Sequence, residues 1–215
     1  MATPTLQRTE TTTSETTTAP GGTAAAPART PATTTTWTID PQHSTVGFSV
    51  RHMKFATVHG HFNDFHGTIQ FDADHPWDAR VNAEIDVASI DTGIKKRDDH
   101  LRSGDFFDVA TYPVITFRST RIRPAAPGGR NRWLVIGDLT IHGITRIVEL
   151  SVEQTGAPGG RSTNVIEFTA TTKISRKKFG MAFYRPIESG ELVVGDEVTA
   201  SIAIQATRIP DSPDT

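Results

Sequence analysis

Two histidines in the segment His59-Gly60-His61 are the side chains best placed to bind a metal ion. Residues i and i+2 of a strand project to one face, so His59 and His61 would stand side by side. A catalytic zinc centre needs three protein ligands and an open position, and His52 and His66 are the candidates for the third ligand. However, the sequence contains no HExxH segment and no second HxH pair. A solvent-facing or hydrogen-bonded pair is the simpler interpretation, and we predict neither a metal nor any other cofactor.

Nucleophilic catalysis has less support in this sequence. None of the 215 residues is Cys, which excludes disulfides, thiolate nucleophiles and thiolate metal sites. No Ser stands in a GxSxG segment. Asp105 and Asp108 have the spacing of a carboxylate pair, but capping of a short turn explains both. We therefore predict no catalytic residues and no enzymatic activity; an enzyme with a His-bound metal is the alternative.

Residues 89–113 interrupt a series of strand-like segments and form the one stretch with a helical pattern. Asp91 or Thr92 is suited to cap the start of a helix there. Ile94 and Leu101 lie two turns apart and would share one face, while the charged residues would face water. We expect this segment either to cover the mouth of a binding site or to be a surface helix that connects two strands.

The charges of this segment cancel, because four cations and four anions lie between residues 95 and 108. An anionic ligand would therefore have to compete with four aspartates for any arginine. We expect Arg97 and Arg102 at the mouth to act mainly as latches to nearby carboxylates and only secondarily as head-group contacts. Phe106 and Phe107, in a short turn after the helix, would face the ligand.

Composition excludes several classes of partner. The net charge is −2 and the longest basic run is the triplet at residues 176–178, so nucleic acid is not an expected partner. No run approaches the roughly 20 apolar residues of a membrane span. Residues 1–36 are rich in Thr, Ala and Pro and lack the apolar region of a secretory signal. We expect them to be a disordered tail, and we expect the protein to be cytoplasmic.

A single domain is predicted over residues 37–208, followed by a short C-terminal tail at residues 209–215. Within it, apolar and polar residues alternate with the period of two that is typical of half-buried strands. The predicted strands cover residues 45–51, 62–71, 80–87, 114–122, 133–141, 144–152, 165–174 and 198–206.

Short connections join most of these strands and therefore make neighbouring strands antiparallel. His142-Gly143 has the composition of a two-residue hairpin turn, while residues 127–129 and 158–160 are predicted loops. Closing the sheet on itself is the best way to remove its edges. We predict an all-β, up-and-down β-barrel of about eight strands with a short helical insertion. A two-sheet sandwich is the alternative, because periodicity does not separate the two folds.

Alternation also assigns the residues that face the interior of the barrel, and Phe179, Met181 and Phe183 alternate in a way that suits an entrance. The residues that we expect to contact a ligand are Phe48, Val50, Ile85, Val87, Leu101, Phe106, Phe107, Val148, Leu150, Ile166, Phe168, Phe179, Met181, Phe183, Ile202 and Ile204.

Six phrases of the sequence occur in an order and spacing that resemble the YceI-like polyisoprenoid-binding family. They are IDPQHSTVGFSVRHM (39–53), VHGHFNDFHGTIQFD (58–72), SIDTGIKKRDDHLRSGDFFDV (89–109), YPVITFRS (112–119), GDLTIHGITR (137–146) and ISRKKFGM (174–181). The resemblance implies a lipocalin-like barrel, often dimeric, that holds a long isoprenoid or other aliphatic chain. Many members of the family carry an export signal; this sequence departs from that pattern, so a periplasmic role is not carried over.

The resemblance, together with the predicted barrel, implies a protein that binds, carries or stores a long-chain isoprenoid or similar amphiphilic lipid. Each buried CH₂ contributes about 0.8 kcal/mol whereas a neutral hydrogen bond contributes about 1 kcal/mol, so the chain would set the affinity and the polar groups the orientation. The alternatives are a His-metal-dependent enzyme that acts on a lipid and a non-lipid protein-interaction module with a fully packed barrel. A homodimer is possible for either function.

Overall fold

The computed structural model describes residues 34–52, 56–72, 75–126, 131–156, 164–183 and 194–209. Most of the two predicted tails, and both loops predicted at residues 127–129 and 158–160, lie outside the described residues. The first strand begins at Thr35, two residues before the expected start of the domain. At the other end, the Ile209 amide donates to the Thr36 carbonyl at 3.0 Å, so the two ends of the domain meet.

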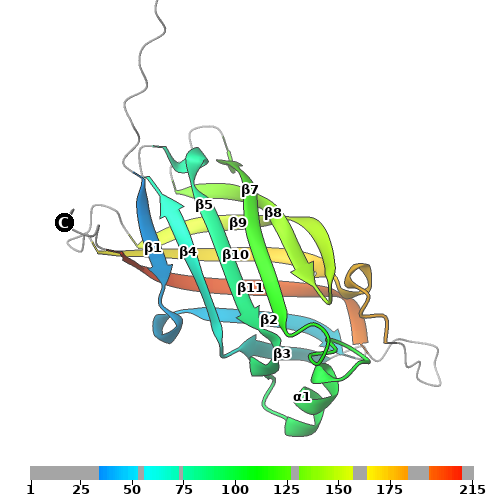
Figure 1. Ribbon diagram of the computed structural model, residues 1–215. Helices are drawn as coiled ribbons and strands as arrows, with labels where there is room; N and C mark the ends of the chain where they lie inside the picture. Colours follow the sequence, from blue (N-terminus) through cyan, green and yellow to red (C-terminus); the bar gives the residue numbers. More distant parts are fainter. Residues whose placement is uncertain are drawn as a thin grey trace, which may run out of the picture. The chain divides into compact units, whose positions relative to one another are not determined.

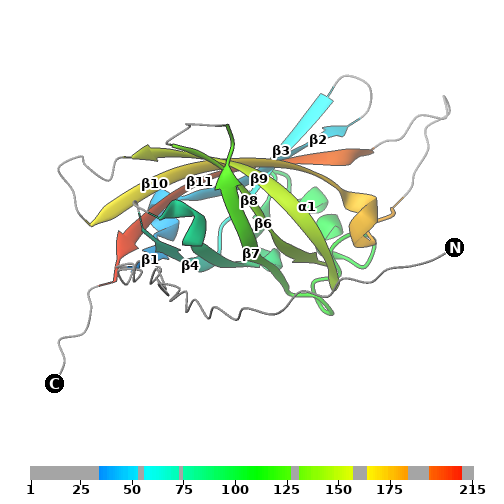
Figure 2. The ribbon, with the colours of Figure 1, turned by 90° about the horizontal axis from the view of Figure 1, so that it is seen from above.

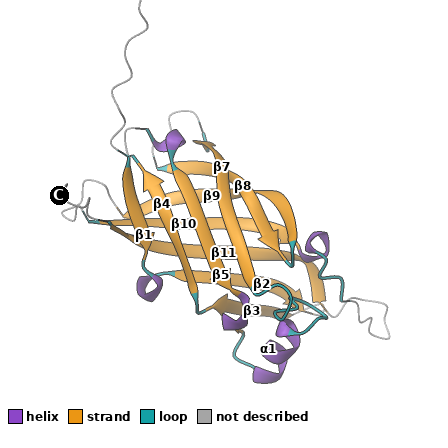
Figure 3. Cartoon of the chain, viewed as in Figure 1, coloured by secondary structure: helices purple, strands orange, loops and turns teal. Residues whose placement is uncertain are grey.

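The described chain forms one 11-stranded antiparallel sheet, with short helical segments near the ends of the strands (Figure 3). The strands are β1 (Thr35–Ile39), β2 (Thr45–His52), β3 (Ala56–Phe62), β4 (Phe65–Phe71), β5 (Arg80–Asp86), β6 (Ile90–Asp91), β7 (Val114–Pro124), β8 (Arg132–Ile141), β9 (Ile144–Gly156), β10 (Val165–Ser175) and β11 (Val194–Arg208). The helical segments are the α-helix α1 (Lys95–Arg102) and the 3-10 turns η1 (Pro41–His43), η2 (Pro76–Asp78), η3 (Val87–Ser89) and η4 (Arg176–Phe179).

Eight of the strands close into a barrel. Their order is β1-β4-β5-β7-β8-β9-β10-β11, and β11 pairs back to β1 (Figure 1). Closure leaves these strands without a free edge along the seam, as expected for a stable antiparallel barrel. The predicted eight-stranded barrel with a short helix is therefore confirmed, and the two-sheet alternative is wrong.

The long strand β11 shares one of its edges between two partners. Its first part, from Val194 to Ala203, pairs with β2, and its last residues pair with β1. Gln205 lies at the changeover, where its carbonyl accepts from the Asp40 amide at 2.9 Å and its amide donates to Ser44 Oγ at 3.0 Å. The strands β2, β3 and β6 thus extend the sheet beyond the closed ring.

Two strand predictions need correction. The strand predicted at residues 62–71 is β4 and begins only at Phe65, because the chain turns at Asn63 and Asp64; Phe62 is instead the last residue of β3, a strand that was not predicted. The strand predicted at residues 45–51 is β2, which lies outside the closed ring, and β1 takes the expected place in it. A strand belongs to the closed ring or lies outside it according to the part of β11 with which it pairs. The local alternation of apolar and polar residues does not predict that pairing.

The helix α1 is present, but it begins later than its predicted caps. Ile94 occupies the N-cap position without a side-chain capping bond and is 52% exposed, so it does not share a buried face with Leu101. Asp91 accepts a hydrogen bond from the Gly93 amide, and Thr92 donates through both its amide and its hydroxyl to Asp98. Both predicted caps are therefore used in the turn that precedes the helix.

The hairpin predicted at His142-Gly143 is confirmed between β8 and β9. Both residues have positive φ, 52° and 70°, as a two-residue turn of the mirror-image type requires. A side chain at Gly143 would also place its Cβ 2.5 Å from Tyr112 Cε1. Positive φ and this close approach together explain why glycine is required here.

We expect Gly143→Ala to lower the free energy of unfolding by about 1–3 kcal/mol, through left-handed strain and displacement of the Tyr112 ring. Gly104→Ala is the matched control, because Gly104 has no positive φ and nothing lies within 4 Å of its added Cβ. Urea denaturation of both variants measures the difference. Equal losses would contradict the turn assignment.

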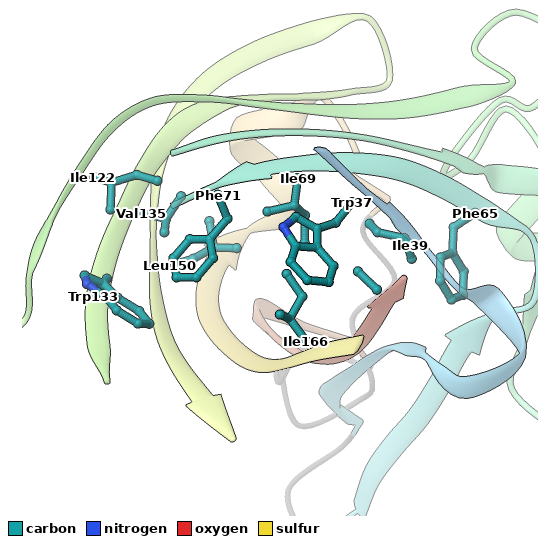
Figure 4. Close-up of a cluster of buried hydrophobic side chains, with 11 residues drawn as sticks. Trp37, Ile39, Phe65, Ile69, Phe71, Ile122, Trp133, Val135, Leu150 and Ile166 are labelled. Atoms are coloured by element: carbon teal, nitrogen blue, oxygen red, sulfur yellow. The ribbon is translucent and has the colours of Figure 1, made fainter. Parts of the chain in front are cut away.

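The interior of the barrel holds two apolar clusters. One of them gathers Trp37, Phe71, Trp133 and Ile166 with other side chains that point into the space enclosed by the strands (Figure 4). The second is built around Ile90 and other buried residues nearer to α1. Seen from above, the strands surround this interior and α1 lies towards one end of it (Figure 2). The two clusters together form the wall of the cavity described next.

Candidate ligand-binding cavity

A cavity of about 290 Å³ lies inside the barrel and extends over both apolar clusters. Its volume is close to the lower end of the range of small-molecule sites, roughly 300–1,000 Å³. Aliphatic and aromatic side chains dominate the lining, and the polar residues that contribute to it are His66, Thr172 and Arg176. Such a space suits a slender apolar chain rather than a polar ligand.

Alternate residues of the strands supply this lining. On β11, Ala200, Ile202 and Ile204 line the cavity, whereas Ala203 is exposed on the outside. The predicted ligand contacts that do line the cavity are Phe48, Val50, Ile85, Leu101, Phe106, Phe107, Val148, Leu150, Phe168, Met181, Ile202 and Ile204.

Four predicted contacts lie elsewhere. Val87 is buried in η3, because β5 ends at Asp86 and the alternation ends with it. Ile166 is 1% exposed within the packed cluster of Figure 4, and Phe179 is 2% exposed within the second cluster. Phe183 packs its ring on those of His100 and Phe106. These side chains support the wall, and the cavity lining does not include them.

Aromatic side chains close the end of the cavity next to α1. The rings of Phe48 and Phe62 lie 5.7 Å apart, and Phe107 meets Phe62 edge-on at 6.1 Å. Phe106 is buried beneath the ring of His100 at 5.1 Å. The helix and the turn that follows it thus place an aromatic layer over the interior.

The two arginines of this segment bind backbone carbonyls, which corrects the predicted latch to carboxylates. Arg97 donates to the hydroxyl and carbonyl oxygens of Thr92, at 2.7 and 2.6 Å. Arg102 donates to the carbonyls of Ala88 (2.8 Å) and Ile90 (2.6 Å), and lies 3.5 Å from an Asp99 oxygen. Neither arginine lines the cavity. The arginines bond backbone carbonyls because the turn before α1 brings these carbonyls closer to the guanidinium groups than the exposed carboxylates are.

One charge of α1 is buried rather than solvated. Asp98 is 6% exposed, and its carboxylate accepts bonds from the Thr92 amide and hydroxyl. Because Arg97 also bonds Thr92, a single residue before the helix is held by two residues of its first turn. This arrangement fixes the start of α1 without a conventional N-cap.

Arg176 is the feature of the site that the sequence prediction missed. It is 3% exposed and lines the cavity where β10 passes into η4. Its guanidinium donates to the carbonyls of Gly195 (2.9 Å), Met181 (2.5 Å) and Val194 (3.1 Å). Burial lowers the pKa of Arg176 below its ordinary value, and the negative charge of Asp196 opposes that shift. In the sequence, the signal that the chain turns inward here is the largely apolar phrase FGM, which directly follows the basic triplet of residues 176–178.

The histidine pair points away from the cavity. His59 and His61 are both exposed on the outer face of β3, whose residues between and after them, Gly60 and Phe62, face the opposite way. His66 lies 3.5 Å from a Glu84 oxygen on the barrel surface. Among the residues that the structure describes, no three His, Asp or Glu side chains gather closely enough to hold a metal ion. In the same part of the chain, no helix is long and apolar enough to cross a membrane.

Comparisons with known proteins agree with this architecture. A UPF0312 protein of Photorhabdus laumondii is 37% identical over 145 residues, which cover 66% of this chain and 72% of that protein. The crystal structure of BcnA from Burkholderia cenocepacia superposes with a TM-score of 0.67 at 30% identity, covering 79% of this chain and 99% of that one. A polyisoprenoid-binding domain from Saccharophagus degradans, implicated in plant cell wall breakdown, matches with a TM-score of 0.62 at 17% identity, covering 80% and 98%. The model of the YceI-like domain matches residues 37–206, and the chain therefore belongs to the YceI-like domain family.

Proposed function

We propose that this protein binds a long-chain isoprenoid or similar amphiphilic lipid inside the barrel and carries or stores it without altering it. The observation that carries the proposal is the apolar cavity, enclosed by strands on its sides and by the aromatic layer next to α1. The description of the Saccharophagus domain as polyisoprenoid-binding supports the same ligand class. A fully packed interaction module has less support, because its barrel would not leave such a space.

The energetics favour a ligand that is mostly chain. Ten buried CH₂ groups would contribute about 8 kcal/mol before ordering costs, whereas each neutral hydrogen bond adds about 1 kcal/mol. The lining of the cavity is apolar over most of its length, so it can supply the contribution from buried CH₂ groups. A metal-dependent reaction has no comparable support, since the exposed His59 and His61 lie outside the cavity. A cytoplasmic location and a homodimer stay predictions.

The proposal is tested first on the native ligand. Protein purified gently from its native host is extracted with organic solvent, and the extract is analysed by mass spectrometry. We expect a stoichiometric long-chain lipid. Recovery of the protein without any lipid, together with failure of added polyprenols to bind, would count against a lipid carrier.

A cavity-filling substitution gives a second test. Ala200→Trp places an indole in the cavity, whereas Ala203→Trp, on the same strand, places it on the exposed outer face. We expect Ala200→Trp to abolish lipid retention and Ala203→Trp to leave it unchanged, with both variants folded by circular dichroism. Retention of lipid by folded Ala200→Trp protein would place the ligand elsewhere.

A further inference from the structure

The Arg176 guanidinium has more donors than its protein partners use. Arginine carries five N–H groups in a planar fork, and here three of them bond the carbonyls of Gly195, Met181 and Val194. Each of the three nitrogens thus has one protein acceptor, and the hydrogen bonds of the described chain include no acceptor for the second N–H of either terminal nitrogen. Arg176 is 3% exposed, so bulk water does not replace that acceptor freely. A buried donor left without a partner is unfavourable, so a bound molecule with an acceptor would be stabilised there.

The surroundings of Arg176 decide what kind of acceptor fits. It is the one cation among the lining residues of the described chain, and apolar residues such as Ile174 and Val198 line the cavity beside it. The negative charge of Asp196 already offsets part of the positive charge of Arg176. Burial alone would raise the pKa of Asp196, but hydrogen bonds from Ser175 Oγ and the Lys177 amide, with the charges of Lys177 and Arg176, hold it below its ordinary value. The carboxylate therefore stays ionised near neutral pH.

An anionic ligand would have to lose its hydration in this apolar space and compete with the fixed charge of Asp196. A neutral carbonyl oxygen has a much smaller desolvation cost and can accept from both remaining N–H groups through its two lone pairs. We infer that Arg176 is the polar anchor of the cavity and that it binds the carbonyl oxygen of a neutral, long-chain amphiphile. This inference rests on the proposed lipid-binding function and adds the head-group class to it.

The position of Arg176 also fixes the direction of the ligand. The carbonyl end lies where η4 and the start of β11 meet, since Arg176 begins η4 and bonds the carbonyls of Val194 and Gly195 in β11. The chain then extends along the cavity towards Phe168 and Trp133 in the first apolar cluster. Affinity comes from that chain, and Arg176 selects among head groups.

A matched ligand series tests the anchor. Farnesylacetone (a ketone), farnesyl phosphate (an anion) and farnesene (no head group) share one type of chain, and their dissociation constants are measured on the wild type, Arg176→Met and Lys177→Met. Lys177 is the control because its side chain is exposed. We expect Arg176→Met to weaken farnesylacetone by about 10- to 100-fold, the range of one charge-assisted hydrogen bond, while farnesene changes less than about twofold. Lys177→Met should change neither ligand.

A second measurement needs no variant, which matters because Arg176 also holds three backbone carbonyls. The infrared stretching frequency of the ketone of farnesylacetone should fall on binding to the wild type, relative to the ketone in hexane. Three results would each overturn the assignment of Arg176 as the carbonyl anchor. They are an unshifted frequency, equal weakening of farnesylacetone and farnesene binding in Arg176→Met, and selective weakening of farnesyl phosphate binding. If the wild type binds none of the three ligands, the proposed lipid-binding function itself fails.

Discussion

A Phe168→Asp variant is expected to lose bound lipid and most of its folding stability. Phe168 lines the cavity, and its ring packs against those of Phe71 (5.6 Å) and Trp133 (6.3 Å). Removing a buried Phe side chain alone costs about 3–5 kcal/mol, and a carboxylate without a partner adds several more. Domains of this kind have only about 5–15 kcal/mol of stability in total. The free energy of unfolding and the lipid content after purification measure the effect.

The control is the next residue of the same strand. Thr169 is exposed on the outer face of β10, so Thr169→Asp places the same carboxylate in water. We expect Thr169→Asp to change the free energy of unfolding by less than about 0.5 kcal/mol, as surface substitutions usually do, and to retain lipid. Equal effects at both positions would refute the inward assignment of Phe168 and with it the face assignment of β10.

Replacing both Arg97 and Arg102 with Gln is expected to speed the release of lipid. These two arginines hold α1 to the preceding turn through four hydrogen bonds to Thr92, Ala88 and Ile90. Loss of these bonds should make opening of α1 more frequent. Because water and the Gln amides replace most of them, we expect a net effect of about one charge-assisted bond, roughly 1.5–3 kcal/mol, and release about 10- to 100-fold faster. Dissociation rates of a neutral polyprenol and its phosphate should rise by similar factors, because both leave through the same opening.

Lys95→Gln is the control for this variant. In the wild type, the Lys95 ammonium group pairs with Asp99 at 2.7 Å, but the Lys95 side chain is 87% exposed. Such surface pairs contribute little to stability. Release from Lys95→Gln should match the wild type. Selective acceleration of the phosphorylated ligand in the double variant would instead make Arg97 and Arg102 head-group contacts, contrary to their observed bonds with the backbone.

Much of the fold is predictable because its determinants are local. Alternation identifies the strands, and two residues with tolerance for positive φ identify the turn at His142-Gly143. How deeply each side chain is buried depends less on the neighbouring sequence. Ile166 and Phe168 both belong to β10 and both face inward, yet Ile166 is packed under Trp37 and its neighbours whereas Phe168 reaches the cavity. Periodicity separates faces, but it does not separate a packed interior residue from a lining one.

The charged residues of the site are not predictable from local pattern, because distant backbone satisfies them. Arg176 belongs to a basic triplet that is typical of a solvated surface, but carbonyls of Met181, Val194 and Gly195 converge on it. Asp98 resembles its exposed neighbour Asp99 in sequence, but it is buried by bonds with Thr92. Such groups become evident only when the carbonyls and amides around them are placed in three dimensions.

The seam between β1 and β11 has a consequence for how the chain is made. These strands come from opposite ends of the described chain and share three residue pairs, from Trp37↔Arg208 to Ile39↔Ala206. Contacts between such distant residues form slowly, because a long loop must close first. On the ribosome, β1 emerges before the other strands of the barrel and its partner β11 after them, so the barrel stays open until β11 has been synthesised. Until then its apolar interior is exposed to other chains, and this interval is when a nascent chain of this protein most needs a chaperone.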